Sequence, residues 1–267
     1  MSHSDLVLFE TRGRVGLLTL NDPKRRNALS DGMIDQLLAR LDEASRQRDL
    51  GCLVLTGAGG AFCAGGDVKD MRDRAGYAAG GPADIRDAML SSFQRIPRAF
   101  FALDLPVVAA VAGPAIGAGC DIAAMCDMVV AADSASFAES FVRLGVLSGD
   151  GGAWFLMRAI GYQRTAEMTL TGDAINAHTA KEWGLVGSVV AEGDLLDEAM
   201  ALAERIARHP QRTLRMAKRL LRETYLGSMH SSLELAATMQ GVAFHTEDHR
   251  EAVAAMFEKR AGQFNGK

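Results

Sequence analysis

Short runs of β-branched and other apolar residues recur through the first half of the chain and predict buried strands. The clearest runs span residues 15–20 (VGLLTL), 52–56 (CLVLT), 107–111 (VVAAV) and 128–132 (MVVAA). Each run has the length of a strand and ends near small or turn-forming residues. Because segments with helical spacing separate the runs, the pattern predicts an α/β fold, with helices packed outside a mostly parallel sheet.

Apolar residues at helical spacing mark the segments between these strands. The first helix is expected to open within residues 27–30, with Ser30 as its N-cap. The apolar face of this helix comprises Ile34, Leu37, Leu38 and Leu41. Residues 84–102 and 118–126 are expected to form further helices. The polar, glycine-containing segment 68–82 is expected to be a mobile loop.

Beyond about residue 151 the strand signal almost disappears and helical spacing dominates. The helical segments span residues 163–171, 177–183, 194–208, 212–226, 231–245 and 247–260. The sequence therefore predicts an α/β core over residues 1–200, followed by a C-terminal helical region over residues 201–267. Apolar stripes in this region, such as Leu214, Leu220 and Leu221, predict that it packs against the core or a neighbouring subunit.

Composition places the chain among ordinary soluble globular proteins, since its 267 residues are 48% hydrophobic and 23% charged. The formal charge of −4 and the lack of a basic face argue against nucleic acid as a partner. No run reaches the roughly 20 apolar residues that span a membrane, and the N-terminus lacks a signal-peptide pattern. The four cysteines form no Cys-x-x-Cys pair. They are expected to be reduced, buried thiols of a cytoplasmic protein without a metal site.

Two glycine-rich segments directly after predicted strands carry the candidate chemistry. They are Ala61–Asp67 (AFCAGGD) and Gly113–Asp121 (GPAIGAGCD). Neither segment has the GxGxxG or GxxxxGK[ST] spacing of a nucleotide site. Residues with almost no side chain let backbone N–H groups approach a ligand closely. Two such groups from separate strand ends would form an oxyanion hole, so the sequence predicts an enzyme that stabilises an enolate.

Five colinear segments extend this pattern along the chain. They span residues 21–30 (NDPKRRNALS), 61–71 (AFCAGGDVKDM), 106–127 (PVVAAVAGPAIGAGCDIAAMCD), 170–173 (LTGD) and 257–260 (FEKR). Together they resemble the enoyl-CoA hydratase/isomerase family, the crotonase superfamily, over roughly residues 6–265. The resemblance implies a crotonase-type spiral of ββα units whose C-terminal helical region forms trimers, often paired into hexamers. It also implies an acyl-CoA substrate and no separate cofactor, because coenzyme A enters as part of the thioester.

The resemblance further implies which residues hold the substrate. The oxyanion-hole donors would be the backbone N–H groups of Gly66 and Ala118. Coenzyme A would lie against Lys24, Arg25, Ala28, Ala64, Asp67 and Val68. Lys259 matches a position that, in relatives, reaches coenzyme A from a neighbouring subunit. The aromatic residue usual three positions before that lysine is Met256 here.

Candidate proton-transfer residues distinguish the possible reactions. In hydratases of the family two glutamates act on water. The first aligns with Asp121, and the second aligns with Phe141, which lines the acyl pocket and cannot transfer a proton. Glu139 would share a face with Phe141 in an extended segment and could substitute for the missing glutamate. Asp150 lies one residue beyond the position of the base in some isomerases. Its neighbouring glycines permit a shift that aims it at the substrate, although it could equally cap a helix.

The sequence therefore favours double-bond isomerisation of an enoyl-CoA, with Asp121 or Asp150 as the proton shuttle. Hydration of a 2-enoyl-CoA is the alternative within the same family. A catalytically inactive acyl-CoA-binding protein is a third hypothesis, prompted by Phe141 and the offset of Asp150.

Overall fold

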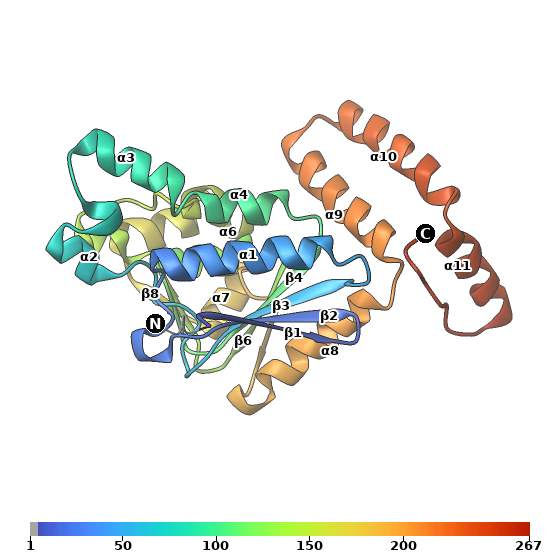
Figure 1. Ribbon diagram of the computed structural model, residues 1–267, viewed down its shortest axis with the longest axis horizontal. Coiled ribbons are helices and arrows are strands. Elements are labelled where there is room, and N and C mark those ends of the chain that lie inside the picture. Colours follow the sequence, from blue (N-terminus) through green and yellow to red (C-terminus); the bar gives the residue numbers. More distant parts are fainter. Residues whose placement is uncertain (1–4) are drawn as a thin grey trace.

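Two β-sheets form the centre of the molecule in the computed structural model, which describes residues 5–267 (Figure 1). The larger sheet has the order β1 (Val7–Arg12), β2 (Val15–Leu20), β3 (Cys52–Gly57), β4 (Val107–Val111), β6 (Met128–Ala132) and β9 (Ser188–Val190). Strands β1 and β2 form an antiparallel hairpin, and every other pair is parallel. The four predicted runs are β2, β3, β4 and β6, so the prediction of a mostly parallel sheet is confirmed.

A smaller sheet lies beside the ends of β4 and β6. It contains β5 (Pro114–Ile116), β7 (Ser136–Ala138) and β8 (Ala174–Asn176), with β7 parallel to β5 and antiparallel to β8. At its end, the backbone N–H of Gly117 donates to the carbonyl oxygen of Ala138 at 2.7 Å. This hydrogen bond therefore holds the second glycine-rich segment against the end of β7.

Alternation along the strands gives the larger sheet two apolar faces. One face packs on α8 (Leu195–Ala207) and includes Cys52, Val54, Val108 and Ala110. The other face packs on α1 (Asp31–Arg46), α4 (Arg95–Ala102) and α5 (Ala118–Met125) and includes Leu53, Leu55, Val107 and Ala109. Figure 1 shows α1 and α4 on one side of the sheet and α8 on the other. The boundary expected between residues 200 and 201 thus falls inside a helix that covers the sheet.

The first helix begins where its cap predicts. The Ser30 hydroxyl accepts a hydrogen bond from the backbone N–H of Met33 at 3.3 Å, as expected for an N-cap. The face of α1 toward the sheet buries Ile34, Leu37 and Leu41, while Leu38 is partly buried.

Two predictions between β3 and β4, one of a single helix and one of a loop, need correction. Residues 84–102 belong to two helices, α3 (Pro82–Ser91) and α4, rather than to one. Pro97 lies in the first turn of α4 and has no N–H to donate to the carbonyl four residues earlier, so a single continuous helix is interrupted before it. The segment 68–82 is not a loop throughout. It begins with α2 (Val68–Asp73), capped by the Asp67 carboxylate, which accepts from the N–H of Lys69 at 2.9 Å.

The C-terminal half is helical, as predicted. It contains α6 (Gly152–Thr171), α7 (Ala177–Trp183), α9 (Gln211–Leu226), α10 (Met229–Phe244) and α11 (Glu247–Glu258). No helix within residues 5–267 is both long and apolar enough to cross a membrane. All four cysteines lie buried in the described core as free thiols.

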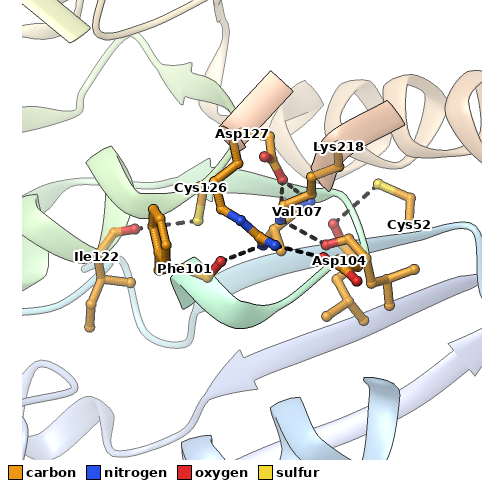
Figure 2. Close-up of polar contacts among 11 residues, drawn as sticks. Cys52, Phe101, Asp104, Val107, Ile122, Cys126, Asp127 and Lys218 are labelled. Atoms are coloured by element: carbon orange, nitrogen blue, oxygen red, sulfur yellow. Dashed lines mark hydrogen bonds and ion pairs between the residues drawn. The ribbon is translucent and has the colours of Figure 1, made fainter. Parts of the chain in front are cut away.

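Helix α9 is fastened to the larger sheet by two basic side chains. The Lys218 Nζ lies 2.7 Å from Asp127 Oδ2, and Figure 2 shows the two side chains beside Val107. The Lys218 Nζ also donates to the Leu105 carbonyl at 2.9 Å. Arg222 pairs with Asp104 at 3.1 Å and donates to the carbonyl of Phe101. Beyond this anchor, α10 and α11 extend away from the sheets (Figure 1).

Candidate active site

A cavity of about 590 Å³ opens beside the loops that follow β3 and β4. Most of its wall is apolar. The segment before α4 contributes Met71, Tyr77, Ile85, Met89 and Phe93, and the segment after β7 contributes Phe141, Leu144, Val146 and Leu147. A concave apolar site with a few polar groups is the usual form of a small-molecule pocket, so the cavity suits an acyl group.

Gly66 and Ala118, the expected oxyanion-hole donors, both line this cavity. In the described part of the chain, neither backbone N–H donates a hydrogen bond to a protein group. Ala118 is the first residue of α5, so its N–H has no acceptor within the helix. Gly117, the N-cap, has φ +53° and ψ −123°, a conformation that glycine adopts without steric cost. The two N–H groups are therefore available to a ligand oxygen in the cavity.

Close backbone packing holds the two loops together. A Cβ atom on Gly65 would lie 3.4 Å from the Ala118 nitrogen, and one on Gly119 would lie only 2.1 Å from the Cys63 carbonyl oxygen. The buried Asn27 amide donates to the carbonyls of residues 58, 61 and 62 at 2.9 to 3.2 Å. Asn27 thus fixes the first loop, a positioning role that the sequence analysis did not identify.

Of the two expected proton shuttles, only Asp150 faces the cavity. Asp150 is 4% exposed and lies in the cavity wall, whereas Asp121 is fully buried behind it on α5. The Ser148 hydroxyl bridges them, at 3.3 Å from Asp121 Oδ2 and 3.4 Å from Asp150 Oδ1. A Cβ on Gly152 would lie 1.8 Å from Asp121 Oδ1, so the glycine makes room for this carboxyl. Gly151, rather than Asp150, is the N-cap of α6, so the capping alternative is wrong.

Glu139 lies near Asp121 and does not line the cavity. Both of its carboxyl oxygens are buried, and its side chain is not part of the cavity wall. The chain turns directly after Glu139 into a 3₁₀ helix, Ser140–Leu144, so the expected extended face shared with Phe141 does not form. Phe141 points the other way, into the cavity, with its ring 3.3 Å from the position that a Cβ on Gly117 would take.

The carboxyl groups of Asp121, Glu139 and Asp150 lie in one buried cluster, and the pKa of each is raised. Burial, followed by the charges of Asp150 and Glu139, raises the pKa of Asp121 well above the usual range. Burial also raises the pKa of Asp150, and a hydrogen bond with Asp121 opposes that rise. The rise is the larger for Asp121, so Asp121 is the member of the pair that binds a proton more tightly. The carboxyl that faces the cavity is the one favoured as the base.

Burial also raises the pKa of Glu139 to about 8. A glutamate in an unfolded chain has a pKa of about 4.3, so between these values the folded protein binds more protons than the unfolded chain. The free energy of unfolding then falls as the pH rises through this interval, and it is largest below it.

We expect the thermal midpoint of the protein to fall from about pH 5 to about pH 9. The Glu139→Gln variant should show a smaller fall, because the neutral amide has no proton to lose. Calorimetry across this range measures the difference, and Glu198→Gln, an exposed site on α8, is the control. Identical pH profiles for Glu139→Gln and the wild type would contradict the assignment of a protonated Glu139.

The residues expected to hold coenzyme A gather around the first loop, with one exception. Lys24, Arg25, Ala28, Ala64, Asp67 and Val68 all lie near the junction of that loop with the 3₁₀ turn Pro23–Arg25. Arg25 lies 2.6 Å from Asp22 and 3.7 Å from Asp67, and the Ala64 N–H donates to the Arg26 carbonyl at 3.0 Å. Lys259 follows α11, at the opposite end of the molecule from α2, so it does not reach the cavity of its own chain (Figure 1).

Comparisons with known proteins agree over almost the whole chain. The sequence model of the Enoyl-CoA hydratase/isomerase family matches residues 10–267. A probable enoyl-CoA hydratase of Mycobacterium bovis is 38% identical over 260 residues, which are 97% of this chain and 98% of that protein. The 1,2-epoxyphenylacetyl-CoA isomerase of Escherichia coli is 35% identical over 263 residues, 98% of this chain and 99% of that protein. The crystal structure of an enoyl-CoA hydratase from Bacillus anthracis superposes with a TM-score of 0.91 at 31% identity, covering 98% of this chain and 100% of that one.

Proposed function

The chain belongs to the enoyl-CoA hydratase/isomerase family of acyl-CoA enzymes, and from that premise we propose that it adds water to a 2-enoyl-CoA thioester. One observation carries this proposal: Asp150 lies in the wall of a cavity that also contains Gly66 and Ala118, and the Ser148 hydroxyl links Asp150 to the buried Asp121 behind it. Two carboxyl groups therefore remain at the site although Phe141 takes the position of one family glutamate. The relatives also favour hydration, since two of the three are named enoyl-CoA hydratases and one is an isomerase.

In the proposed reaction, the thioester oxygen accepts hydrogen bonds from the N–H groups of Gly66 and Ala118. Water attacks C3 of the enoyl group, and the electrons of the double bond move toward the thioester to form an enolate. Asp150 accepts the proton of the attacking water. C2 of the enolate then takes one proton from the Asp121–Asp150 pair, which returns to its starting charge. The N–H donors stabilise the oxygen on which the negative charge develops.

Isomerisation of a 3-enoyl-CoA is the second candidate, and a specific observation favours it. Of the three clustered carboxyl groups, Asp150 alone forms part of the cavity wall. A single carboxylate is sufficient to remove a proton from C2 and return it to C4, with the same N–H groups holding the dienolate oxygen. Phe141 would then shield the dienolate from water.

The two reactions are separated by supplying crotonyl-CoA and a 3-enoyl-CoA to the same preparation. Loss of the conjugated thioester absorbance from crotonyl-CoA measures hydration, and its gain from the 3-enoyl-CoA measures isomerisation. Deuterium uptake at C2 in deuterated water, followed by NMR, reports enolate formation in either case. Hydration much faster than isomerisation is the expected result, and the reverse would favour the second candidate. Absence of turnover and of exchange with several acyl chains would support an inactive acyl-CoA-binding protein.

We also propose that the chain forms a trimer, or a hexamer of two trimers, through the helical region over residues 201–267. Several large apolar side chains of this region are exposed in the single chain: Leu221, Met229, Leu233, Met256 and Phe257 are 61 to 80% exposed. Lys259 lies in the same region, where a neighbouring copy would bring it to another coenzyme A site. Sedimentation at micromolar concentration should show the oligomer. A clean monomer of 28.5 kDa would contradict this assembly.

A further inference from the structure

A tyrosine hydroxyl without a protein partner lies at the candidate oxyanion hole. The Tyr77 Oη is shielded from solvent and finds no hydrogen-bond partner among residues 5–267. It lies 3.0 Å from the position that a Cβ atom on Gly66 would take, so it lies next to one of the two residues that supply the N–H donors. Tyr77 also lines the same cavity as Gly66, Ala118 and Asp150.

Packing, rather than hydrogen bonding, keeps this hydroxyl in place. The ring of Tyr77 meets the ring of Phe93 edge to face, with centroids 4.7 Å apart and an interplanar angle of 68°. The residue sits in the 3₁₀ turn Gly76–Ala78, which is tied to α2 by a hydrogen bond of 2.9 Å from the Ala75 N–H to the Asp70 carbonyl. These contacts place the hydroxyl at the cavity wall beside Gly66.

A buried hydroxyl that lacks a partner costs free energy, and phenylalanine would fill the same space without that cost. No described protein group accepts a hydrogen bond from this hydroxyl, so an oxygen of a molecule bound in the cavity is the fitting partner. Burial, followed by the nearby carboxylates of Asp70, Asp67 and Asp150, raises the pKa of Tyr77 to about 12. The phenol thus keeps its proton at neutral pH and acts as a donor.

We propose that Tyr77 is a further catalytic residue, whose hydroxyl donates a third hydrogen bond to the thioester oxygen beside the N–H groups of Gly66 and Ala118. The inference rests on the proposed function, because it requires an acyl-CoA in the cavity. A third donor adds to the charge that the site can hold on the enolate oxygen. It also orients the carbonyl, since the three donors converge from different chain segments.

Acetoacetyl-CoA tests this donor directly, because its enolate absorbs in the ultraviolet and its ionisation reports the strength of the oxyanion hole. In Tyr77→Phe we expect the apparent pKa of the bound thioester to rise by about one to two units, and kcat to fall by roughly 10–100-fold. The affinity for acetoacetyl-CoA below its pKa should stay near wild type, and the thermal midpoint should equal or exceed that of the wild type, because phenylalanine removes an unpartnered buried hydroxyl. Tyr162→Phe, at a side chain that is 75% exposed on α6, is the matched control and should change none of these quantities.

An unchanged pKa of the bound thioester and an unchanged kcat in Tyr77→Phe would overturn the inference, while leaving the proposed function in place if wild-type binding is normal. Calorimetry of the wild type with acetoacetyl-CoA and with free acetoacetate separates the two failures. Equal affinities for these ligands would overturn both the coenzyme A site and the role of Tyr77. A fall in thermal midpoint that accounts for the whole loss of activity would also overturn the inference.

Discussion

Replacing Asp150 with asparagine is expected to lower kcat by about 10²–10⁴-fold, the usual contribution of a positioned acid or base. The amide keeps the shape of the carboxylate and its contact with the Ser148 hydroxyl but cannot accept a proton. Substrate affinity should therefore change little. Steady-state rates with crotonyl-CoA and a 3-enoyl-CoA, together with deuterium exchange at C2, measure the loss.

Asp121→Asn extends this experiment. If the Asp121–Asp150 pair supplies the proton to C2, hydration should fall in both variants, whereas a single-base isomerisation should depend mainly on Asp150. Asp133→Asn, at an exposed site after β6, controls for the substitution itself. An Asp150→Asn variant with wild-type turnover of both substrates would remove Asp150 from the mechanism.

Replacing Gly117 with alanine is expected to lower kcat/KM by about 10²–10³-fold, the cost of losing one oxyanion-hole donor. At φ +53° and ψ −123° a side chain strains the backbone, and the added Cβ would lie 3.3 Å from the Phe141 ring. The peptide that carries the Ala118 N–H must therefore rotate, and the donor no longer points into the cavity. Turnover and acyl-CoA affinity, measured on the folded variant, give the loss.

Gly13→Ala is the matched control for this strain. Gly13 also has a positive φ, +60°, but a Cβ there meets no atom within 4 Å, and the residue lies in the turn between β1 and β2. Both variants should lose some thermal stability, and only Gly117→Ala should lose activity. Equal activities in the two variants would remove the Ala118 N–H from the oxyanion hole.

The parts of the fold that the sequence predicts are those decided by local patterns. The long strands β2, β3, β4 and β6 are continuous apolar runs, and α1 has both a cap and an apolar face. The strands β5, β7, β8 and β9 have three residues each, too few to show a period. They form because distant segments pair with them, which no local pattern records.

The same distinction applies to the candidate site. The glycine-rich loops predict where backbone N–H groups face a ligand, and the structure brings Gly66 and Ala118 to one cavity. The contact between Asp121 and Asp150 depends on how α5 packs on the start of α6, so the sequence left the choice between them open. Tyr77 gave no signal, since a lone aromatic residue in a polar segment is compatible with many positions.

The anchor of α9 on the larger sheet also constrains the order in which the chain folds. Lys218 donates a hydrogen bond to the carbonyl of Leu105, which lies 113 residues before it in the sequence. Arg215 donates to the carbonyl of Gln47, 168 residues before it, at 2.9 Å. These acceptors take up their positions only when the ends of β3 and β4 are in place, so the last helices have no docking surface beforehand. Contacts of such long range form slowly, because the intervening chain must first be ordered. During synthesis the sheet is complete once β9 has emerged, and the C-terminal helices then close onto a finished surface.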